Sequence, residues 1–172
     1  MNAHPQASNH TLLPSQHELG QELIRGNITP GQFLGLSPQR LYEFATLAHH
    51  LLMDGKLQAA LDIFKGLVAA SPWDSVFHCN LAATYAQLER FPEAMAAYTT
   101  ALRFNLANVD ALVGRSELFL REGKVAEALQ DLEGALRLDP QAERESIQRA
   151  RATLMLLGTM ADAAEDGEGS PR

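Results

Sequence analysis

The sequence predicts an all-α protein built as a right-handed stack of helix-turn-helix repeats. The first observation is that one apolar pattern returns three times over residues 41–142, at a constant spacing of about 34 residues. The second is that small residues coincide in the three copies, at Ala60, Ala94 and Ala128. Small side chains let two helices cross at an axial distance of about 8–10 Å, as a compact helix pair requires. We therefore expect these three alanines to be fully buried.

Large apolar side chains keep the same register. Phe64, Tyr98 and Leu132 coincide, and they would fill the space between one repeat and the next, so that the core runs along the stack. A period of about 34 residues with small and aromatic positions in this order is typical of the tetratricopeptide repeat. The predicted repeats are residues 41–74, 75–108 and 109–142.

The chain before the repeats predicts a tail and one short helix. Residues 1–14 are polar and without periodicity, which indicates a flexible tail. Ser15 followed by Glu18 is a capping-box pattern, so the segment 15–37 is expected to start with a helix. A helix this short is unstable alone and has to dock on the repeats or on another copy of the chain. Its apolar stripe, the candidate self-association surface, is Leu19, Leu23 and Ile24.

The repeat domain, with a capping helix after the third repeat, is predicted at residues 38–160. Gly55 and Gly123 separate the two helices of the first and third repeats, because glycine readily adopts the left-handed conformation that ends a helix. Glu89 stands at this position in the second repeat, which is therefore the least regular. Residues 161–172 are acidic and rich in Gly, and we expect a disordered tail.

Composition argues against several classes of function. The chain has 172 residues and a net charge of −7, whereas nucleic-acid binding requires clustered Lys and Arg. It has one cysteine, Cys79, and no visible secretory signal or apolar run long enough to span a bilayer, which favours a cytoplasmic protein. No nucleophile with its base, phosphate loop or metal cluster is visible, so we expect no enzymatic activity, no cofactor and no stable membrane insertion.

A narrower resemblance lies in and just before the first two repeats. The runs that carry it are Leu36-Ser37-Pro38, Leu41-Tyr42, Ala60-Leu61-Asp62-Ile63-Phe64, Pro72-Trp73-Asp74-Ser75-Val76-Phe77 and Leu81-Ala82-Ala83. This pattern resembles the class II chaperones of bacterial type III secretion, the low-calcium-response H type, over roughly residues 23–138. The resemblance implies a cytoplasmic chaperone that binds an extended segment of a hydrophobic secreted translocator in a concave groove and keeps it soluble before export. It also implies a homodimer formed through the N-terminal helix.

The resemblance places that groove along the first helix of each repeat, where residues three or four apart share a face. The candidate groove residues are Tyr42, Ala45, His49, Leu52 and Met53 in the first repeat, Val76, Cys79, Ala83 and Ala86 in the second, and Asp110, Val113, Glu117 and Leu120 in the third. The first two sets are largely apolar, as an apolar peptide would require.

Two other functions stay open at this point. A co-chaperone that binds the charged C-terminal peptide of a large chaperone needs Lys, Asn and Arg in its groove, and only Asn80 fits that pattern. A generic scaffold for protein–protein interaction in another bacterial assembly, such as pilus or envelope biogenesis, is the main alternative.

Overall fold

The computed structural model describes residues 15–141 and 144–168, with side chains as far as residue 163; the predicted tail at residues 1–14 lies outside this range. The part of the chain that is described is helical, without strands, as predicted. Its helices are α1 (Gln16–Ile24), α2 (Pro30–Phe33), α3 (Pro38–Met53), α4 (Leu57–Ala70), α5 (Ser75–Gln87), α6 (Phe91–Phe104), α7 (Val109–Arg121), α8 (Val125–Leu138) and α9 (Glu145–Glu168).

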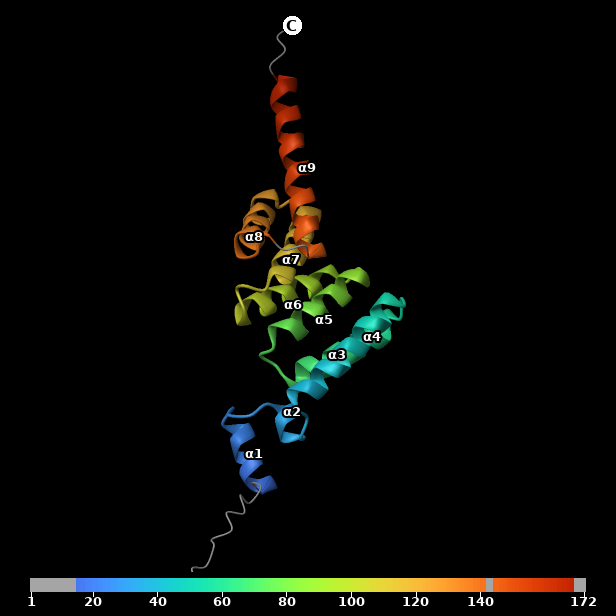
Figure 1. Ribbon diagram of the computed structural model, residues 1–172, viewed down its shortest axis with the longest axis vertical. Helices are drawn as coiled ribbons and strands as arrows, with labels where there is room; N and C mark the ends of the chain where they lie inside the picture. Colours follow the sequence, from blue (N-terminus) through green and yellow to red (C-terminus); the bar gives the residue numbers. More distant parts are fainter. Residues whose placement is uncertain (1–14, 142–143, 169–172) are drawn as a thin grey trace, which may run out of the picture.

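Three helix pairs stack along the long axis of the molecule (Figure 1). The pairs α3–α4, α5–α6 and α7–α8 are the three repeats, and α4 packs on α5 as α6 packs on α7. At one end α9 covers both α7 and α8, and at the other end α1 packs on α2, which packs on α4. Each repeat therefore buries the face that its neighbour leaves open, as in a solenoid.

Helix starts and stops follow the predicted signals. Ser15 and Glu18 form a complete capping box, and Ser37 caps α3. Gly55 and Gly123 have φ angles of 73°, in the left-handed region. Glu89 adopts the same conformation with φ 58°, although it is not a glycine. The repeat geometry therefore overrides the local preference of this side chain.

The core confirms the predicted register. Ala60, Ala94 and Ala128 are each 0% exposed, and small side chains at these places let paired helices approach closely. Phe64 is buried in a cluster shared by the first and second repeats, and Leu132 of the third repeat is buried in a cluster that Ile147 of α9 extends. The apolar core is thus continuous from the third repeat into the capping helix.

Two segments differ from the sequence-based expectation. Helix α9 continues to Glu168, although we expected a disordered tail from residue 161. The lead-in before the repeats contains a second short helix, α2, where only one helix was expected, and Thr29 and Gln32 form a capping box at its start. No helix in the described ranges is long and apolar enough to cross a membrane.

Candidate functional site

Two adjoining cavities of about 240 and 560 Å³ lie along the first helices of the repeats, α3, α5 and α7. They share His49, Val76 and Asn80, so they form one continuous surface, which we call the groove. The smaller cavity is completed by Tyr42, Ala45 and Thr46 of α3. The larger is completed by Cys79, Ala83, Tyr98, Asn108, Asp110, Arg144, Glu145, Ser146 and Arg149.

Tyr42 forms a fixed wall at the first end of the groove. Its ring packs against Phe77 with centroids 5.0 Å apart, and its hydroxyl donates a hydrogen bond of 3.0 Å to Asp74. Partial burial, together with the hydrogen bond to the Asp74 carboxylate, raises the pKa of the Tyr42 hydroxyl. Asp74 in turn caps α5 by accepting from the backbone N–H of Val76.

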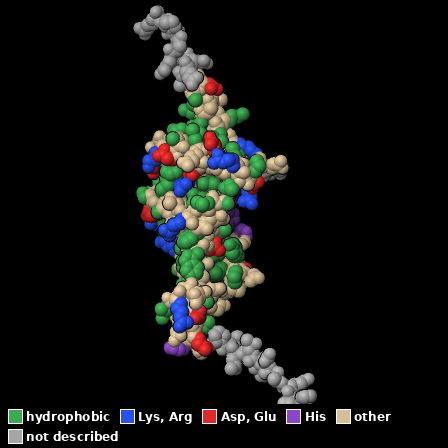
Figure 2. Space-filling model, turned by 90° about the vertical axis from the view of Figure 1, so that its left-hand side faces the viewer, with side chains coloured by type: hydrophobic (Ala, Val, Ile, Leu, Met, Phe, Trp, Pro, Cys, Tyr) green, Lys and Arg blue, Asp and Glu red, His purple; other side chains and the backbone are tan. Residues whose placement is uncertain are grey.

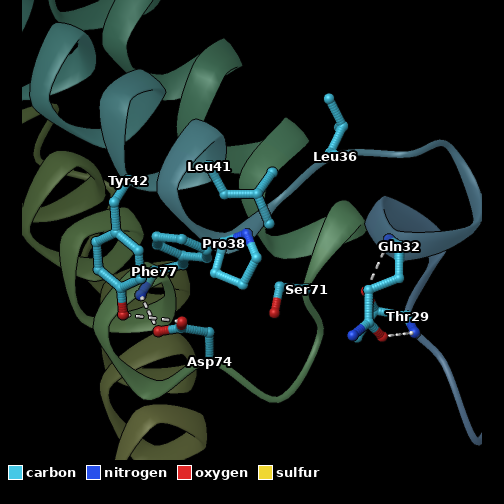
Figure 3. A pocket seen from close by; sticks show the side chains of 9 residues that line it. All are labelled: Thr29, Gln32, Leu36, Pro38, Leu41, Tyr42, Ser71, Asp74 and Phe77. Atoms are coloured by element: carbon cyan, nitrogen blue, oxygen red, sulfur yellow. Dashed lines mark hydrogen bonds between the residues drawn. The ribbon is translucent and has the colours of Figure 1, made fainter.

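The other side of Tyr42 borders a separate pocket of about 170 Å³, shown in Figure 3. Leu36, Leu41 and Phe77 supply its apolar lining, while Gln32 and Ser71 supply polar groups. Tyr42 therefore lies between this pocket and the groove, and Thr29 and Gln32 of the lead-in segment line the opposite side of the pocket (Figure 3).

The far end of the groove is polar and is closed by α9. The Ser146 hydroxyl donates to Asp110 of α7 at 2.6 Å, and Arg149 donates to Glu117 of α7 at 2.9 Å. Arg149 also lies 3.4 Å from Glu145 on its own helix. The groove thus changes from an apolar half on α3 and α5 to a charged half where α9 meets α7.

Cys79 lies in the groove as an unreactive thiol. Its side chain is buried, and burial, followed by the charge of Asp110, raises its pKa to about 12. A thiol with this pKa is almost entirely protonated near neutral pH, and the thiolate is the nucleophilic form. Cys79 therefore contributes a small apolar surface.

The structure brings together only part of the predicted groove. Tyr42, Ala45, His49, Val76, Cys79, Ala83 and Asp110 line it. Leu52 and Val113 do not fit the prediction, since they are 9% and 1% exposed and belong to the apolar core. Four further candidates lie outside the groove lining: Met53 and Glu117 are exposed, whereas Ala86 and Leu120 are half-buried. These residues lie outside the groove because the first helix of each repeat packs against other helices on several sides. Only a narrow face of that helix remains accessible, and its position depends on how the helix is rotated.

Sequence reasoning missed several groove residues. Tyr98 comes from α6, the second helix of its repeat, whereas the groove was expected along the first helices; its side chain reaches the groove beside Gly114. Ser146 and Arg149 come from the capping helix. The glycine at residue 114, in register with the larger Thr46 and Asn80, is a sequence signal that could have pointed to Tyr98.

The predicted self-association stripe lies on α1. Leu19 and Leu23 are half-buried, and Ile24 is 88% exposed. No group of His, Cys, Asp or Glu suited to a metal ion occurs among the described residues.

Comparison with solved structures shows the fold. Similar structures include a type III secretion complex from Aeromonas hydrophila, with 22% identity, a TM-score of 0.71, and coverage of 83% of this chain and 96% of that chain. The Yersinia enterocolitica type III secretion chaperone SycD, in complex with a peptide of the translocator YopD, has 22% identity and a TM-score of 0.63, with 74% and 97% covered. The first repeat domain of Spaghetti (RPAP3), bound to an HSP90 peptide, has 24% identity and a TM-score of 0.61, with 71% and 96% covered.

Comparison with family models gives two overlapping matches, whereas the search of curated proteins gives no match. The tetratricopeptide repeat matches residues 79–143, and the bacterial transcriptional activator domain matches residues 19–108, more than half of the chain. The helix pairs, the period and the buried alanines agree with a repeat protein. The chain therefore belongs to the bacterial transcriptional activator domain family, and its repeats are tetratricopeptide repeats.

Proposed function

We propose that this chain is a cytoplasmic chaperone that holds an extended, mainly apolar segment of a secreted protein in the groove. The partner we propose is a translocator of bacterial type III secretion, kept soluble before export. The observation that carries the proposal is the apolar half of the groove, where Ala45 and Val76 lie beside the fixed ring of Tyr42. The peptide complex of SycD, a protein of the same fold, supports it.

The dimensions and chemistry of the groove suit a few side-chain anchors. Small residues such as Ala45 and Ala83 leave room for aliphatic side chains, and Tyr42 gives them a flat wall. Each buried aliphatic anchor contributes about 1.5–3 kcal/mol to the binding free energy, and the costs of ordering and association are subtracted from the total. Two or three anchors give about 3–9 kcal/mol before these costs, so we expect a peptide affinity no tighter than about micromolar, which permits release for export.

A carboxylate-binding co-chaperone is less well supported. Asn80 lies in the groove, but the other lining residues include Asp110 and Glu145, which would repel an acidic peptide. Arg149 is already paired with Glu117 and Glu145. Arg144, the other arginine of the lining, lies 3.6 Å from Asp139. A terminal carboxylate therefore meets no unpaired cation among the described groove residues, although such peptides need charge-assisted hydrogen bonds.

A scaffold in another bacterial assembly is the alternative to the chaperone. The family name points to transcription, yet the net charge is −7, and basic and acidic side chains are interspersed on the face shown in Figure 2. DNA binding depends on a clustered basic surface. A role in transcription would therefore act through a protein contact.

The test is co-expression of this chain with the products of its neighbouring genes, followed by purification and identification of any apolar secreted protein that co-purifies. His49 and Val76 each line both cavities, and both are exposed, so the fold should tolerate their replacement. Replacing both by Glu adds two negative charges to the groove. This variant should lose the partner while its circular dichroism stays helical. Ala45 and Leu52 are unsuitable for the test because they are buried, and a charge there would unfold the repeat.

The matched control carries the same added charge outside the groove, as Ala59→Glu with Val125→Glu on α4 and α8. It should retain the partner. Loss of the partner in the control, with retention in the groove variant, would show that binding occurs elsewhere. If no secreted apolar protein co-purifies with the wild type, the scaffold becomes the better proposal.

We also propose that α1 mediates a homodimer. Ile24 is 88% exposed beside the half-buried Leu23, which leaves an apolar edge open to another copy. Ile24→Glu should reduce the mass measured by light scattering from dimer to monomer without loss of helicity. Equal masses for the variant and the wild type would remove α1 from the interface.

A further inference from the structure

The side chain of Tyr98 crosses from α6 to the groove through a notch in α7. A Cβ atom at Gly114 would lie 2.7 Å from Tyr98 Cε1 and closer still to Cζ and the hydroxyl oxygen. Glycine at residue 114 therefore makes room for the end of the tyrosine ring. Tyr98 is only 6% exposed, and the exposed part lines the larger cavity.

The packing of the repeats does not require the Tyr98 hydroxyl. The same register position holds Phe64 in the first repeat and Leu132 in the third, and both are buried without any polar atom. The hydroxyl also makes no hydrogen bond with another residue that the structure describes. All fully buried side-chain N and O atoms in the described ranges have a partner, so this hydroxyl oxygen faces the cavity. A tyrosine hydroxyl that faces a cavity and has no partner within the protein can still donate a hydrogen bond to a ligand bound there.

The surroundings make this hydroxyl a hydrogen-bond donor. Burial, with the charges of Glu117 and Asp110 among the further causes, raises the pKa of Tyr98, so the proton stays on the oxygen. Asp110 and Glu145 line the same cavity, and its two arginines, Arg144 and Arg149, already pair with carboxylates of the protein. A ligand carboxylate is therefore disfavoured at this place. A neutral acceptor is thus the group that fits, and every residue of an extended peptide carries one in its main-chain carbonyl.

We infer that Tyr98 is a specificity-determining residue of the groove, whose hydroxyl donates to a main-chain carbonyl of the bound segment where the apolar half meets the charged half. This inference rests on the proposed function and adds two properties to it. The partner contributes an internal, uncharged stretch of chain, and one fixed hydrogen bond sets its register relative to the apolar pockets.

The experiment uses overlapping 12-residue peptides of the co-purified secreted protein, acetylated and amidated, with affinity measured by fluorescence anisotropy. Tyr98→Phe keeps the ring and removes only the donor, so affinity for the best peptide should fall about 3- to 10-fold. Tyr85→Phe is the matched control, because Tyr85 packs under Arg90 with 4.7 Å between guanidinium carbon and ring centroid, and it does not line the groove. Its affinity should be unchanged.

An ester scan of the same peptide identifies the acceptor, because an ester carbonyl accepts hydrogen bonds more weakly than an amide. One ester position should weaken binding to the wild type and have no further effect on Tyr98→Phe, which is the non-additivity of a direct contact. The melting temperature of Tyr98→Phe should equal that of the wild type, because the hydroxyl has no partner within the protein.

Three results would overturn the inference. The first is equal peptide affinity for Tyr98→Phe and the wild type, and the second is tighter binding of a peptide with a free terminal carboxylate. The third is a clear loss of stability in Tyr98→Phe, which would reveal an internal partner. If no peptide binds the wild type at all, the proposed function itself fails, and that outcome is distinct from the other three.

Discussion

Gly114→Ala is the substitution that best tests the packing of the second repeat against the third. Gly114 is buried in the middle of α7, and the end of the Tyr98 ring fills the place of its missing side chain. The added methyl group would meet Tyr98 Cε1 at 2.7 Å, whereas ordinary van der Waals contact begins at 3.4 Å. Either the ring or α7 has to move.

Two opposing terms decide the size of the effect. Alanine is favoured over glycine inside a helix by about 0.8–1 kcal/mol. Overpacking of a well-packed core costs about 1–3 kcal/mol, and the upper part of this range applies because the ring is 6% exposed and held between two helices. The net change in the free energy of unfolding should therefore be a loss of about 1–2 kcal/mol.

Gly66→Ala is the matched control, because Gly66 is also inside a helix, α4, and a Cβ there would have no atom within 4 Å. It should stabilise the protein by up to about 1 kcal/mol. Urea unfolding of both variants, followed by circular dichroism, gives the comparison.

A third variant isolates the clash. In a Tyr98→Leu background, which imitates Leu132 of the third repeat, the ring is gone and the penalty of Gly114→Ala should largely disappear. Equal stabilisation by Gly114→Ala and Gly66→Ala in the wild-type background would refute the contact between Tyr98 and Gly114.

Three further predictions concern the rest of the fold. Glu89→Gly should raise the free energy of unfolding by about 0.5–1 kcal/mol, because Glu89 holds φ 58° where glycine is unstrained; a decrease in a thermal melt would contradict this. Arg115→Met should lower the free energy of unfolding by about 3–5 kcal/mol, because it leaves the buried carboxylate of Asp131, now bonded to Arg115 at 2.7 and 2.8 Å, without its cation. Adding Asp131→Leu should recover most of this stability in urea unfolding, and no recovery would argue against the pair. Cys79 should resist iodoacetamide at pH 8 in the folded state. Its contribution to stability, fully present below pH 9, should decline as pH rises towards 12, because the thiol of the unfolded chain ionises first. If the free energy of unfolding of Cys79→Ala falls with alkaline pH as steeply as that of the wild type, this prediction is wrong.

Much of the fold could be predicted from the sequence because the same packing contacts recur in each repeat. Contacts between helices can therefore be recognised from a pattern that repeats along the chain. Ala60, Ala94 and Ala128 mark the same helix crossing in each of the three repeats, and all three are fully buried. The turn positions Gly55 and Gly123 were equally visible, and even the exception at Glu89 could be identified from its register. A side chain in such an array meets the same neighbours at each repeat, so the pattern itself carries the contact information.

The groove was predictable only in outline, because its composition depends on how each helix is rotated and on what closes the stack. Val113 satisfied the helical spacing for the open face, yet it points into the core. Tyr98 satisfied the spacing for the core, yet its hydroxyl reaches the groove, since residue 114 has no side chain to stop it. Arg149 joins Glu117, 32 residues earlier in the chain, through an ion pair that exists only once α9 has packed on α7. Periodicity specifies which residues share a face, whereas the depth of a side chain and its partners from other helices are set by tertiary packing.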